Sequence, residues 1–517
     1  MKAILEERSL NNRTAADGSG REIPSFVREM GRGLKMAMIN MDGEDLTGWR
    51  AHGQPVPIRF DRASELFEWR HLFPEWIDEE EEIDGPACPE IPMPDLRMYG
   101  RVDVVVAKVP CGRRPEEGPG GRDVFRLQVH LAAANVAARR GRRWRRTARV
   151  VVLSRCRPMV EVFRCDDLAA REGDWWLFRP AVDRLRQKVA LPVGSCKLAL
   201  PLWAQGVDET YDPSKYAAEG AKTGRREAYA TVLHSSESYV CGAITLAQSL
   251  RGTGTRRELV MLLDDSISAP KRAALAAAGW LLRPIRRIRN PLAQPKTYNE
   301  YNYSKLRLWQ LTDYDKVVFV DADILVLRSL DVLFQFPELS AVGNDGSIFN
   351  SGVMVIEPSE CTFRLLMGLR VAVRSYNGGD QGFLNEVFVW WHRLPRRVNF
   401  LKNFWSNSTV EAGLKEQLFG AEPPKVYAIH YIGLKPWLCY RDYDCNRDVG
   451  DQVVYASDVA HGRWWRLHDA MDAGLQRHCR LKPRRRFELE WDRNKARKAG
   501  LAGDTWKINI TDPRRFD

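Results

Sequence analysis

The chain has 517 residues, which is more than one hydrophobic core usually organises, so we expect two domains or one large domain with extensions. With 44% hydrophobic and 28% charged residues, the composition excludes a wholly disordered protein. The formal net charge of +12 indicates an anionic partner, but charge alone does not choose between nucleic acid, an anionic membrane, an acidic polysaccharide and a sugar nucleotide.

Residues 1–97 mix charges with prolines, include the acidic run at 78–84, and show little periodicity. We therefore predict a poorly structured N-terminal region. No stretch reaches the roughly 20 apolar residues of a membrane-spanning helix, and the first forty residues lack a signal-peptide core. As written, the sequence shows no membrane anchor, and we expect a soluble chain.

Residues 98–222 are predicted to form an accessory α/β region. Apolar runs predict strands at 102–106 and 150–153, a helical pattern covers 124–138, and Trp175 and Trp176 mark an aromatic segment. The basic run at 139–149 contains no base-reading motif, so we interpret it as solvated surface and expect no nucleic-acid partner.

Ten cysteines are scattered between Cys88 and Cys479 without a C-x-x-C pair. This spacing argues against a zinc module and against a small disulfide framework. From the spacing alone, the cysteines fix no cellular compartment.

Residues 223–480 alternate short apolar runs with helical patterns, which is typical of a largely parallel sheet covered by helices. The predicted strands are 228–233, 259–263, 281–285, 317–320 and 352–356. The predicted helices are 240–250 and 269–277. Residues 481–517 are interpreted as a basic C-terminal extension.

Two carboxylates follow the apolar run at 317–320. In Asp321-Ala322-Asp323 they are two residues apart, and in extended backbone such side chains point to the same side. Because ligands of open α/β sheets gather at the carboxyl ends of strands, this pair suits a divalent cation that bridges to a diphosphate. The same spacing at 313–315 and 442–444 lacks a preceding strand and is interpreted as solvated loop. A turn or helix-capping role for the Asp321 pair stays open on the residues alone.

A second group of unlike side chains forms the motif HYIGLKPW at residues 430–437, after a strand-like run at 426–429. An imidazole can complete a metal site, a glycine lets the backbone approach a phosphate, and a lysine can neutralise a departing diphosphate. A lone histidine is more often structural, but its combination with a strand-terminal aspartate pair favours a functional site.

Together, these two motifs resemble those of the retaining glycosyltransferase family that includes glycogenin, galactinol synthases and the plant xylan glucuronosyltransferases. The resemblance implies a Rossmann-like nucleotide-diphospho-sugar transferase fold of the GT-A type. It assigns Mn²⁺, with Mg²⁺ as the alternative, to Asp321, Asp323 and His430. It also implies diphosphate contacts from Gly433 and Lys435, and places Ala322 in the donor site.

Further segments match the family in order. The resemblance implies that Leu233, His234 and Tyr239 hold the nucleotide base, although an aromatic residue that starts a helix is more often a packing residue. It places Lys305 near the donor phosphates, in the helical stretch 303–309. On the residues alone, a lysine on an amphipathic helix is usually just solvated.

Two segments rich in amides and glycine are placed by the resemblance at the donor sugar and the reaction centre: Asn350-Ser351-Gly352 and Asn377-Gly378-Gly379-Asp380-Gln381. Amides and a carboxylate can hydrogen-bond sugar hydroxyls, whereas the alternative is a turn before a helix capped by Asp380. Asp380 or Gln381 would lie near the anomeric carbon. The sequence does not distinguish a covalent intermediate from same-face attack guided by the leaving diphosphate.

Within the family, the resemblance to the plant xylan glucuronosyltransferases extends over most of residues 98–480. It implies UDP-glucuronate as donor, a β-1,4-xylan acceptor, an α-1,2-linked branch, and the Golgi lumen, where assembly with other wall-synthesis enzymes is expected. Family members of this type carry an N-terminal transmembrane segment, which is not visible in this sequence.

The residues say less about the donor sugar. Arg307 could pair with the carboxylate of glucuronate or could face solvent. The first alternative is therefore a hexosyltransferase of the glycogenin or galactinol synthase kind that uses UDP-glucose or UDP-galactose. The second is an inactive relative that binds glycan or serves as a scaffold.

Overall fold

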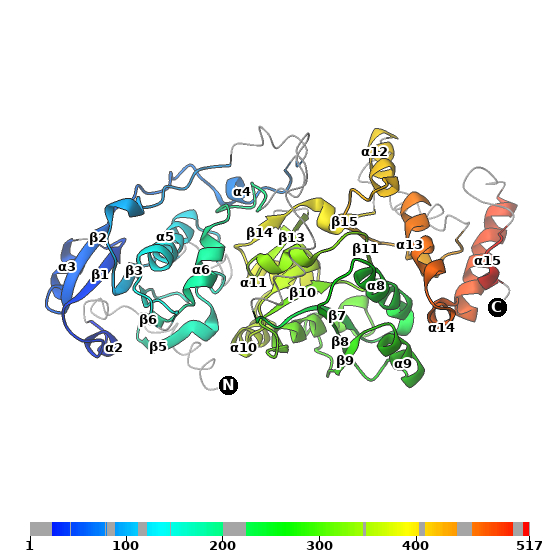
Figure 1. The fold of residues 1–517 in the computed structure, drawn as a ribbon, viewed down its shortest axis with the longest axis horizontal. Helices are drawn as coiled ribbons and strands as arrows, with labels where there is room; N and C mark the ends of the chain where they lie inside the picture. Colours follow the sequence, from blue (N-terminus) through cyan, green and yellow to red (C-terminus); the bar gives the residue numbers. More distant parts are fainter. Residues whose placement is uncertain are drawn as a thin grey trace.

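The structure, a computed structural model, describes residues 23–41, 43–77, 79, 88–111, 121–144, 146–199, 224–344, 348–402, 409–441, 458–499 and 510–515. Two α/β regions lie side by side along the long axis of the molecule (Figure 1). The N-terminal region, blue to cyan, occupies one end, and a larger region, green to yellow, occupies the middle. The C-terminal helices, orange to red, lie at the other end.

The N-terminal region is built on a six-stranded sheet with the order β2-β1-β3-β4-β6-β5. Its strands are β1 (Leu34–Ile39), β2 (Gly53–Ile58), β3 (Val104–Lys108), β4 (Val150–Leu153), β5 (Leu168–Glu172) and β6 (Trp175–Phe178). Strands β1 to β4 pair in parallel, and β6 is antiparallel to β4 and β5. The helices are α2 (Ser25–Arg28), α3 (Gly43–Trp49), α4 (Trp69–Leu72), α5 (Val124–Arg140) and α6 (Val182–Val189).

The prediction that residues 1–97 are poorly structured was wrong for residues 34–58. Strand β1 pairs with β3, and its second half is buried in the sheet. Strand β2 carries Pro55 and Pro57, which the prediction took as signs of irregular structure. Because β2 lies at the edge of the sheet, its prolines need no partner on the open side, and edge strands tolerate them for this reason.

The larger region is built on a seven-stranded sheet with the order β14-β12-β13-β10-β7-β8-β9. Its strands are β7 (Glu227–Leu233), β8 (Glu258–Leu263), β9 (Leu281–Pro284), β10 (Lys316–Val320), β12 (Ser340–Asn344), β13 (Ile348–Ile356) and β14 (His392–Leu394). Only β13 pairs antiparallel, with β10 and β12. The predicted α/β class with a mostly parallel central sheet is therefore confirmed.

A small three-stranded sheet brings distant segments of the larger region together. It joins β11 (Ile324–Val326), β16 (Ala428–His430) and β15 (Phe400–Leu401) in the order β11-β16-β15. In the antiparallel pair, Ile324 lies opposite His430. The carboxylate pair that precedes β11 and the histidine that ends β16 therefore meet at the same edge.

The helices of the larger region are α8 (Val240–Gly252), α9 (Ala269–Ala277), α10 (Glu360–Leu369), α11 (Asp380–Val387), α12 (Thr409–Gly420), α13 (Asp458–Ala470), α14 (Ala473–Gln476) and α15 (Pro483–Lys498). The stretch predicted as helical at 303–309 is a 3₁₀ helix, η6 (Asn302–Gln310). In the described part of the chain, no helix has the length and hydropathy that a membrane span requires.

The two regions are joined covalently and by buried charges. Cys165 forms a disulfide with Cys361 in α10. Beside it, Arg164 donates to Glu357 at 3.0 Å, and both side chains are buried. Apolar side chains from both large sheets belong to one continuous hydrophobic cluster. The predicted boundary at residue 222 lies outside the described residues and stays a prediction.

Disulfides connect segments that are far apart in sequence. Those between described cysteines are Cys88–Cys196, Cys111–Cys156, Cys165–Cys361 and Cys241–Cys479, with separations of 45 to 238 residues. Cys439 is also disulfide-bonded. The fold decides these pairings, so the spacing of the cysteines could not predict them.

The predicted C-terminal extension packs onto the larger region. Leu489 of α15 and Ile510 form a buried cluster with Cys439 and Tyr440. Asp512 and Arg514, close to the end of the chain, are also buried. The C-terminal residues therefore belong to the same packed body.

Candidate functional site

The two aspartates and the histidine singled out from the sequence lie together. Asp321 follows the last residue of β10, and its backbone N–H donates to the carbonyl of Gly352 on β13 at 2.9 Å. The backbone of Asp323 is held by Tyr431, whose N–H donates to its carbonyl at 2.9 Å. One ligand atom from each of Asp321, Asp323 and His430 lies within 4.8 Å of the other two. The set of two carboxylates and one imidazole suits a divalent cation.

The electrostatics of the two carboxylates differ. Burial would raise the pKa of Asp323, but Lys435 at 2.5 Å and His430 at 3.3 Å hold that pKa well below its ordinary value. Burial raises the pKa of Asp321, and the neighbouring Asp323 adds to the rise against the opposing effect of Lys305. The two carboxylates repel each other, and one of them resists ionisation. A divalent cation between them would offset this repulsion.

His430 is oriented by asparagines behind it. Asn399 donates through Nδ2 to Asn350 Oδ1 at 2.9 Å, so its own Oδ1 accepts from His430 Nδ1 at 3.0 Å. His430 Nε2 is then the ring nitrogen that faces Asp323 Oδ1, at 3.3 Å. With Nδ1 held by Asn399, Nε2 is the nitrogen directed at the two carboxylates, so the residues fit a metal ion here.

Sequence reasoning missed Asn399, because a single asparagine in a 3₁₀ turn carries no pattern. The sequence places Asn350 at the donor sugar. In the structure its side chain lies behind His430, and its contact with a sugar stays a prediction. There, Asn350 Oδ1 also accepts from the N–H of Gly352 at 2.8 Å. A Cβ atom on Gly352 would lie 2.7 Å from His430 Cε1, so only glycine lets the strand pass this close to the imidazole.

The loop after His430 carries the predicted diphosphate contacts. Gly433 has a φ of 69°, a conformation that glycine adopts at little cost. This turn lets Lys435 fold back, so that its ammonium donates to Asp323 at 2.5 Å and to the carbonyl of Tyr431 at 2.6 Å. Lys435 thus lies against the metal-capable cluster of Asp321, Asp323 and His430. There, a diphosphate could accept a hydrogen bond from its ammonium.

A second ion-paired group adjoins the first. Lys305 Nζ lies 2.7 Å from Asp380 Oδ2 and 3.4 Å from Asp321 Oδ1. Burial opposes its charge, but Asp321 and Asp380 raise the pKa of Lys305 above its ordinary value. Ser351 Oγ accepts from Lys305 at 3.2 Å, and the Ser351 N–H donates to Gln381 Oε1 at 3.0 Å. Lys305, Ser351, Asp380 and Gln381 therefore form one connected group, and their contacts with a donor stay a prediction.

The alternative reading of Asp380 as a helix cap is not what the structure shows. Helix α11 begins at Asp380, the preceding Gly379 occupies the cap position, and no side chain caps the helix. The carboxylate instead pairs with Lys305. Asn377 caps the turn locally, because its Oδ1 accepts from the N–H of Gly379 at 2.9 Å.

Two neighbouring loops present exposed tyrosines beside this group, and sequence reasoning missed both. Tyr376 is 56% exposed and accepts from Gln381 Nε2 at 2.9 Å. Tyr298 is 83% exposed and lies near Tyr239, a tyrosine whose pKa is raised by burial. The two loops are joined by Asn290, which donates to the carbonyl of Gly378 at 2.8 Å. The only sequence signal was an aromatic residue next to an asparagine in each loop.

The predicted nucleotide loop follows β7, which ends at Leu233. His234 is half-buried, and burial lowers its pKa against the influence of Asp264 and Asp380. Tyr239 lies edge-on to Trp437, with ring centroids 6.0 Å apart, and the ammonium of Lys435 lies 5.6 Å from its ring. The loop therefore adjoins the metal-capable cluster. Its contact with a base stays a prediction.

Several other sequence features lie away from the cluster. Asp313 pairs with Arg283 at the surface, and Asp315 accepts from the backbone of Arg226, in agreement with the loop interpretation. The pair at 442–444 lies outside the described residues. Arg307 donates to the carbonyl of Arg286 and to Gln310, so the structure does not bring it to the site.

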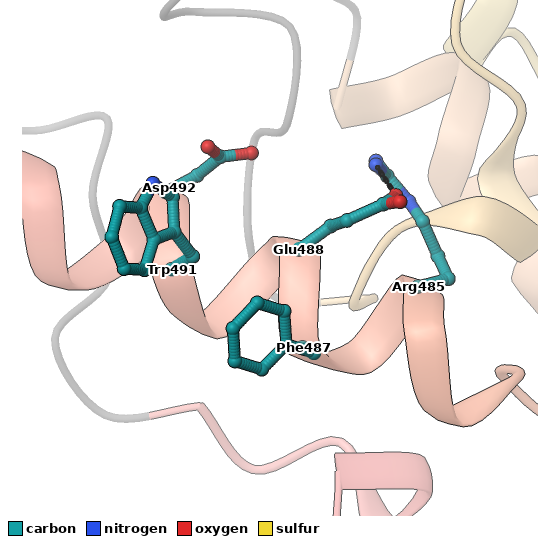
Figure 2. A pocket seen from close by; sticks show the side chains of 5 residues that line it. All are labelled: Arg485, Phe487, Glu488, Trp491 and Asp492. Atoms are coloured by element: carbon teal, nitrogen blue, oxygen red, sulfur yellow. Dashed lines mark hydrogen bonds and ion pairs between the residues drawn. The ribbon is translucent and has the colours of Figure 1, made fainter.

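A pocket of about 390 Å³ lies elsewhere, on the outer face of α15 (Figure 2). It is lined by Arg485, Phe487, Glu488, Trp491 and Asp492. The rings of Phe487 and Trp491 project from successive turns of the helix, while Arg485 pairs with Glu488 at 3.2 Å. The pocket contains none of the residues of the metal-capable cluster.

The comparisons with known proteins point to one family. Residues 17–196 match the model described as the GUX1-5 N-terminal domain, and residues 230–440 match glycosyl transferase family 8. The chain is 62% identical to UDP-glucuronate:xylan alpha-glucuronosyltransferase 2 of Arabidopsis thaliana, over 100% of this chain and 87% of the relative. It is 48% identical to the xylan alpha-glucuronosyltransferase 1 of the same plant, over 95% of this chain and 74% of the relative.

More distant matches cover less of the chain. Glycogenin-1 of Caenorhabditis elegans is 36% identical over 41% of this chain and 51% of its own length. A solved structure of the galactosyltransferase LgtC with donor and acceptor sugar analogues is 19% identical, with a TM-score of 0.34, over 48% of this chain and 96% of LgtC. At this TM-score the structural likeness carries no weight, and the relationship rests on the sequence relatives.

Proposed function

Because the chain belongs to glycosyltransferase family 8, and within it to the xylan alpha-glucuronosyltransferases, we propose that it transfers glucuronate from UDP-glucuronate to xylan and forms α-1,2 branches. The family membership confirms the resemblance that the two motifs indicated. The observation that carries the proposed chemistry is the cluster of Asp321, Asp323 and His430 at the end of β10, with Lys435 and Lys305 on its two sides.

The N-terminal region favours a xylan enzyme over a hexosyltransferase of the glycogenin kind. Residues 17–196 match a domain model of their own, whereas the match to glycogenin-1 covers 41% of the chain. The names of the two Arabidopsis relatives supply the donor and the acceptor of the proposal.

In the proposed reaction, Asp321, Asp323 and His430 hold Mn²⁺ or Mg²⁺. The bound cation would act as a Lewis acid that stabilises charge on the diphosphate. Lys435 adds a second positive charge on the same side, where the bond from the anomeric carbon to the diphosphate breaks. The backbone turn at Gly433 leaves room for the phosphates to approach.

On the sugar side, Lys305 orients Asp380, and the N–H of Ser351 orients Gln381. In either route the acceptor oxygen replaces the diphosphate on the anomeric carbon, and the diphosphate accepts the proton of the acceptor hydroxyl. Both routes to retention stay open in this proposal. In one, Asp380 attacks first; in the other, the acceptor attacks from the face that the diphosphate leaves.

The exposed tyrosines support a sugar chain as the acceptor. The faces of pyranose rings carry C–H groups that pack on aromatic rings, and amides beside such rings can hydrogen-bond the hydroxyls. Tyr376 lies within a hydrogen bond of Gln381, so a chain packed on its ring would present a hydroxyl close to the reaction centre.

For the compartment, we propose the Golgi lumen, where wall polysaccharides would be decorated together with other wall-synthesis enzymes. The disulfides support this placement, because disulfides persist in oxidising compartments and are rare in the cytosol.

A donor screen tests the proposal. The full chain is incubated with Mn²⁺, xylo-oligosaccharides and either UDP-glucuronate, UDP-glucose or UDP-galactose, and products are identified by mass. We expect glucuronate transfer from the parent, none after metal removal by a chelator, and none from Asp321→Ala. Asp313→Ala is the matched control, because it removes an aspartate from a pair of the same spacing at the surface, and it should retain parental activity.

The other outcomes identify the alternatives. Transfer only from UDP-glucose or UDP-galactose would assign the chain to the hexosyltransferases. Xylan binding without turnover of any donor would identify an inactive, glycan-binding relative. Equal product from the parent and Asp321→Ala would refute the metal role.

A further inference from the structure

The C-terminal residues reach the donor site through one tryptophan. Trp437 is buried, and its Nε1 donates to the carbonyl of Ser238 at 2.7 Å. The ring of Trp437 lies edge-on to Tyr239. The same ring packs closely on Gly242, where an added Cβ atom would lie 2.4 Å from Trp437 Cη2. Two residues earlier, Lys435 contacts Asp323. Trp437 therefore links the nucleotide loop to the phosphate loop.

Arg514 holds the backbone of this tryptophan. Its Nη1 donates to the carbonyl of Trp437 at 3.2 Å and to that of Cys479 at 3.4 Å, and its Nη2 donates to the carbonyl of Cys439. The guanidinium is buried over the ring of Trp465, with its Cζ 4.2 Å from the ring centroid. A planar fork spreads its N–H donors over three nitrogens and so reaches these separated carbonyls, whereas the donors of a lysine leave from one atom.

Asp512 completes the arrangement. It is fully buried, pairs with Arg514 Nη2 at 2.6 Å, and accepts from the backbone N–H of Arg441 at 2.9 Å. Cys479, which Arg514 also contacts, forms a disulfide with Cys241 in the helix that follows the nucleotide loop. The contacts of Asp512 and Arg514 are therefore connected to the nucleotide loop that carries Tyr239 and to the phosphate loop that carries Lys435.

We propose that Asp512 and Arg514 are positioning residues of the UDP site, which act through Trp437 on Lys435 and Tyr239. The inference rests on the proposed function, since it presupposes that the two loops bind UDP. It gives the C-terminal segment a role in donor binding.

The test measures UDP binding to the full chain by calorimetry in the presence of Mn²⁺, together with thermal unfolding. Arg514→Lys keeps the positive charge beside Asp512 but loses the fork. We expect its dissociation constant for UDP to rise about ten-fold, the range in which outer-shell contacts act. The matched control is Arg515→Lys, because Arg515 pairs with Glu490 on α15, and it should bind UDP like the parent.

A second variant keeps the test decisive if Arg514→Lys does not fold. Trp437→Phe retains a ring but loses the hydrogen bond to Ser238, and it should weaken UDP binding to a similar degree. In the double variant the two losses should not add, because both residues act on the same link. Parental affinity in either folded single variant would overturn the inference. Failure of the parent to bind UDP would instead refute the proposed function.

Discussion

The two large sheets are built alike, but their parallel strands end in different side chains. In the N-terminal sheet, β3 ends at Lys108, whose ammonium pairs with Asp45 at 2.8 Å. The positive charge of Lys108 and the negative charge of Asp45 cancel, so this pair has no net charge. In the larger sheet, the end of β10 gathers the carboxylates of Asp321 and Asp323, and Asp380 adds a third beside Lys305 and Lys435. This excess of negative charge, and not the fold alone, supports the proposed cation site.

The largest effect that would test this contrast comes from changing one aspartate beside the end of a strand in each region. Asp323→Asn removes a proposed metal ligand and leaves the buried ammonium of Lys435 without its partner. We expect a loss of about ten-thousand-fold in the rate of glucuronate transfer. Asp45→Asn on α3, which removes the partner of Lys108, should leave the rate within about two-fold of the parent. Initial rates at saturating Mn²⁺ check both, and equal losses would contradict the contrast between the sheets.

The second prediction concerns the charges that join the sheets. Glu357 forms ion pairs with Arg164 at 3.0 Å and with Arg184 at 2.9 Å. The ammonium of Lys316 lies 3.7 Å from the Glu357 carboxylate. Glu357→Gln would remove the carboxylate that these three cations share, while Asp166, Glu338 and Asp167 stay paired with the two arginines. The free energy of unfolding, measured in urea, should fall by about 3 kcal/mol. Glu360→Gln, which breaks an exposed pair with Arg364, should cost less than about 1 kcal/mol. If Glu357→Gln lowered the free energy of unfolding as little as Glu360→Gln does, the charges between the two regions would contribute little to stability.

The same residue predicts a pH dependence. Burial opposes the charge on Glu357, but Lys316, Arg164 and Arg184 hold its pKa below its ordinary value of 4.5. The unfolded chain therefore binds this proton at a higher pH than the folded chain does. The stabilisation is fully present above about pH 4.5 and is lost as the pH falls toward the folded pKa. Between pH 5 and 3, the parent should lose more unfolding free energy than Glu357→Gln, and equal slopes would assign acid sensitivity to other groups.

The sequence predicted those parts of the fold and site that depend on local patterns. Continuous apolar runs gave β7, β8 and β10, and the aspartate pair after β10 was placed correctly because strand ends collect ligands. The runs missed β2, whose prolines are tolerated only because it lies at an edge. They also missed β11 and β15, which have two or three residues each and exist because β16 pairs with both.

Parts of the site that depend on tertiary contacts could not be predicted. Asn399 orients His430 only because β15 lies beside β16. Arg514 reaches Trp437 only because the C-terminal residues pack back on the loop. The role of Asp380 was ambiguous in sequence, since a carboxylate after two glycines also suits a helix cap. Its contact with Lys305 comes from a segment 75 residues earlier.

A smaller effect is expected from Gly352, which contacts the imidazole at the site. Gly352→Ala would place a methyl group 2.7 Å from His430 Cε1 and push the ring away from Asp323. We expect Mn²⁺ affinity, measured by calorimetry, to fall about 10- to 100-fold. Gly462→Ala on α13 meets no atom within 4 Å and should leave the affinity unchanged. Parental affinity in Gly352→Ala would show that the imidazole can shift without loss of the ion.

The smallest effect separates the ring of Tyr376 from its hydroxyl. A Cβ atom on Gly382 would lie 2.9 Å from Tyr376 Cδ1, so the glycine makes room for the ring beside α11, while the ring stays 56% exposed. If an acceptor sugar packs on this ring, Tyr376→Ala should raise the KM for xylo-oligosaccharides about 3- to 10-fold, as loss of one aromatic contact does. Tyr376→Phe keeps the ring and loses only the hydrogen bond from Gln381, so its acceptor KM should match the parent even if kcat falls.

The comparison is made with short and long oligosaccharides, because a packing surface for a chain benefits the longer acceptor more. A Tyr376→Ala variant with parental KM for every length would remove this ring from the acceptor surface, and an equal rise in Tyr376→Phe would assign the effect to Gln381.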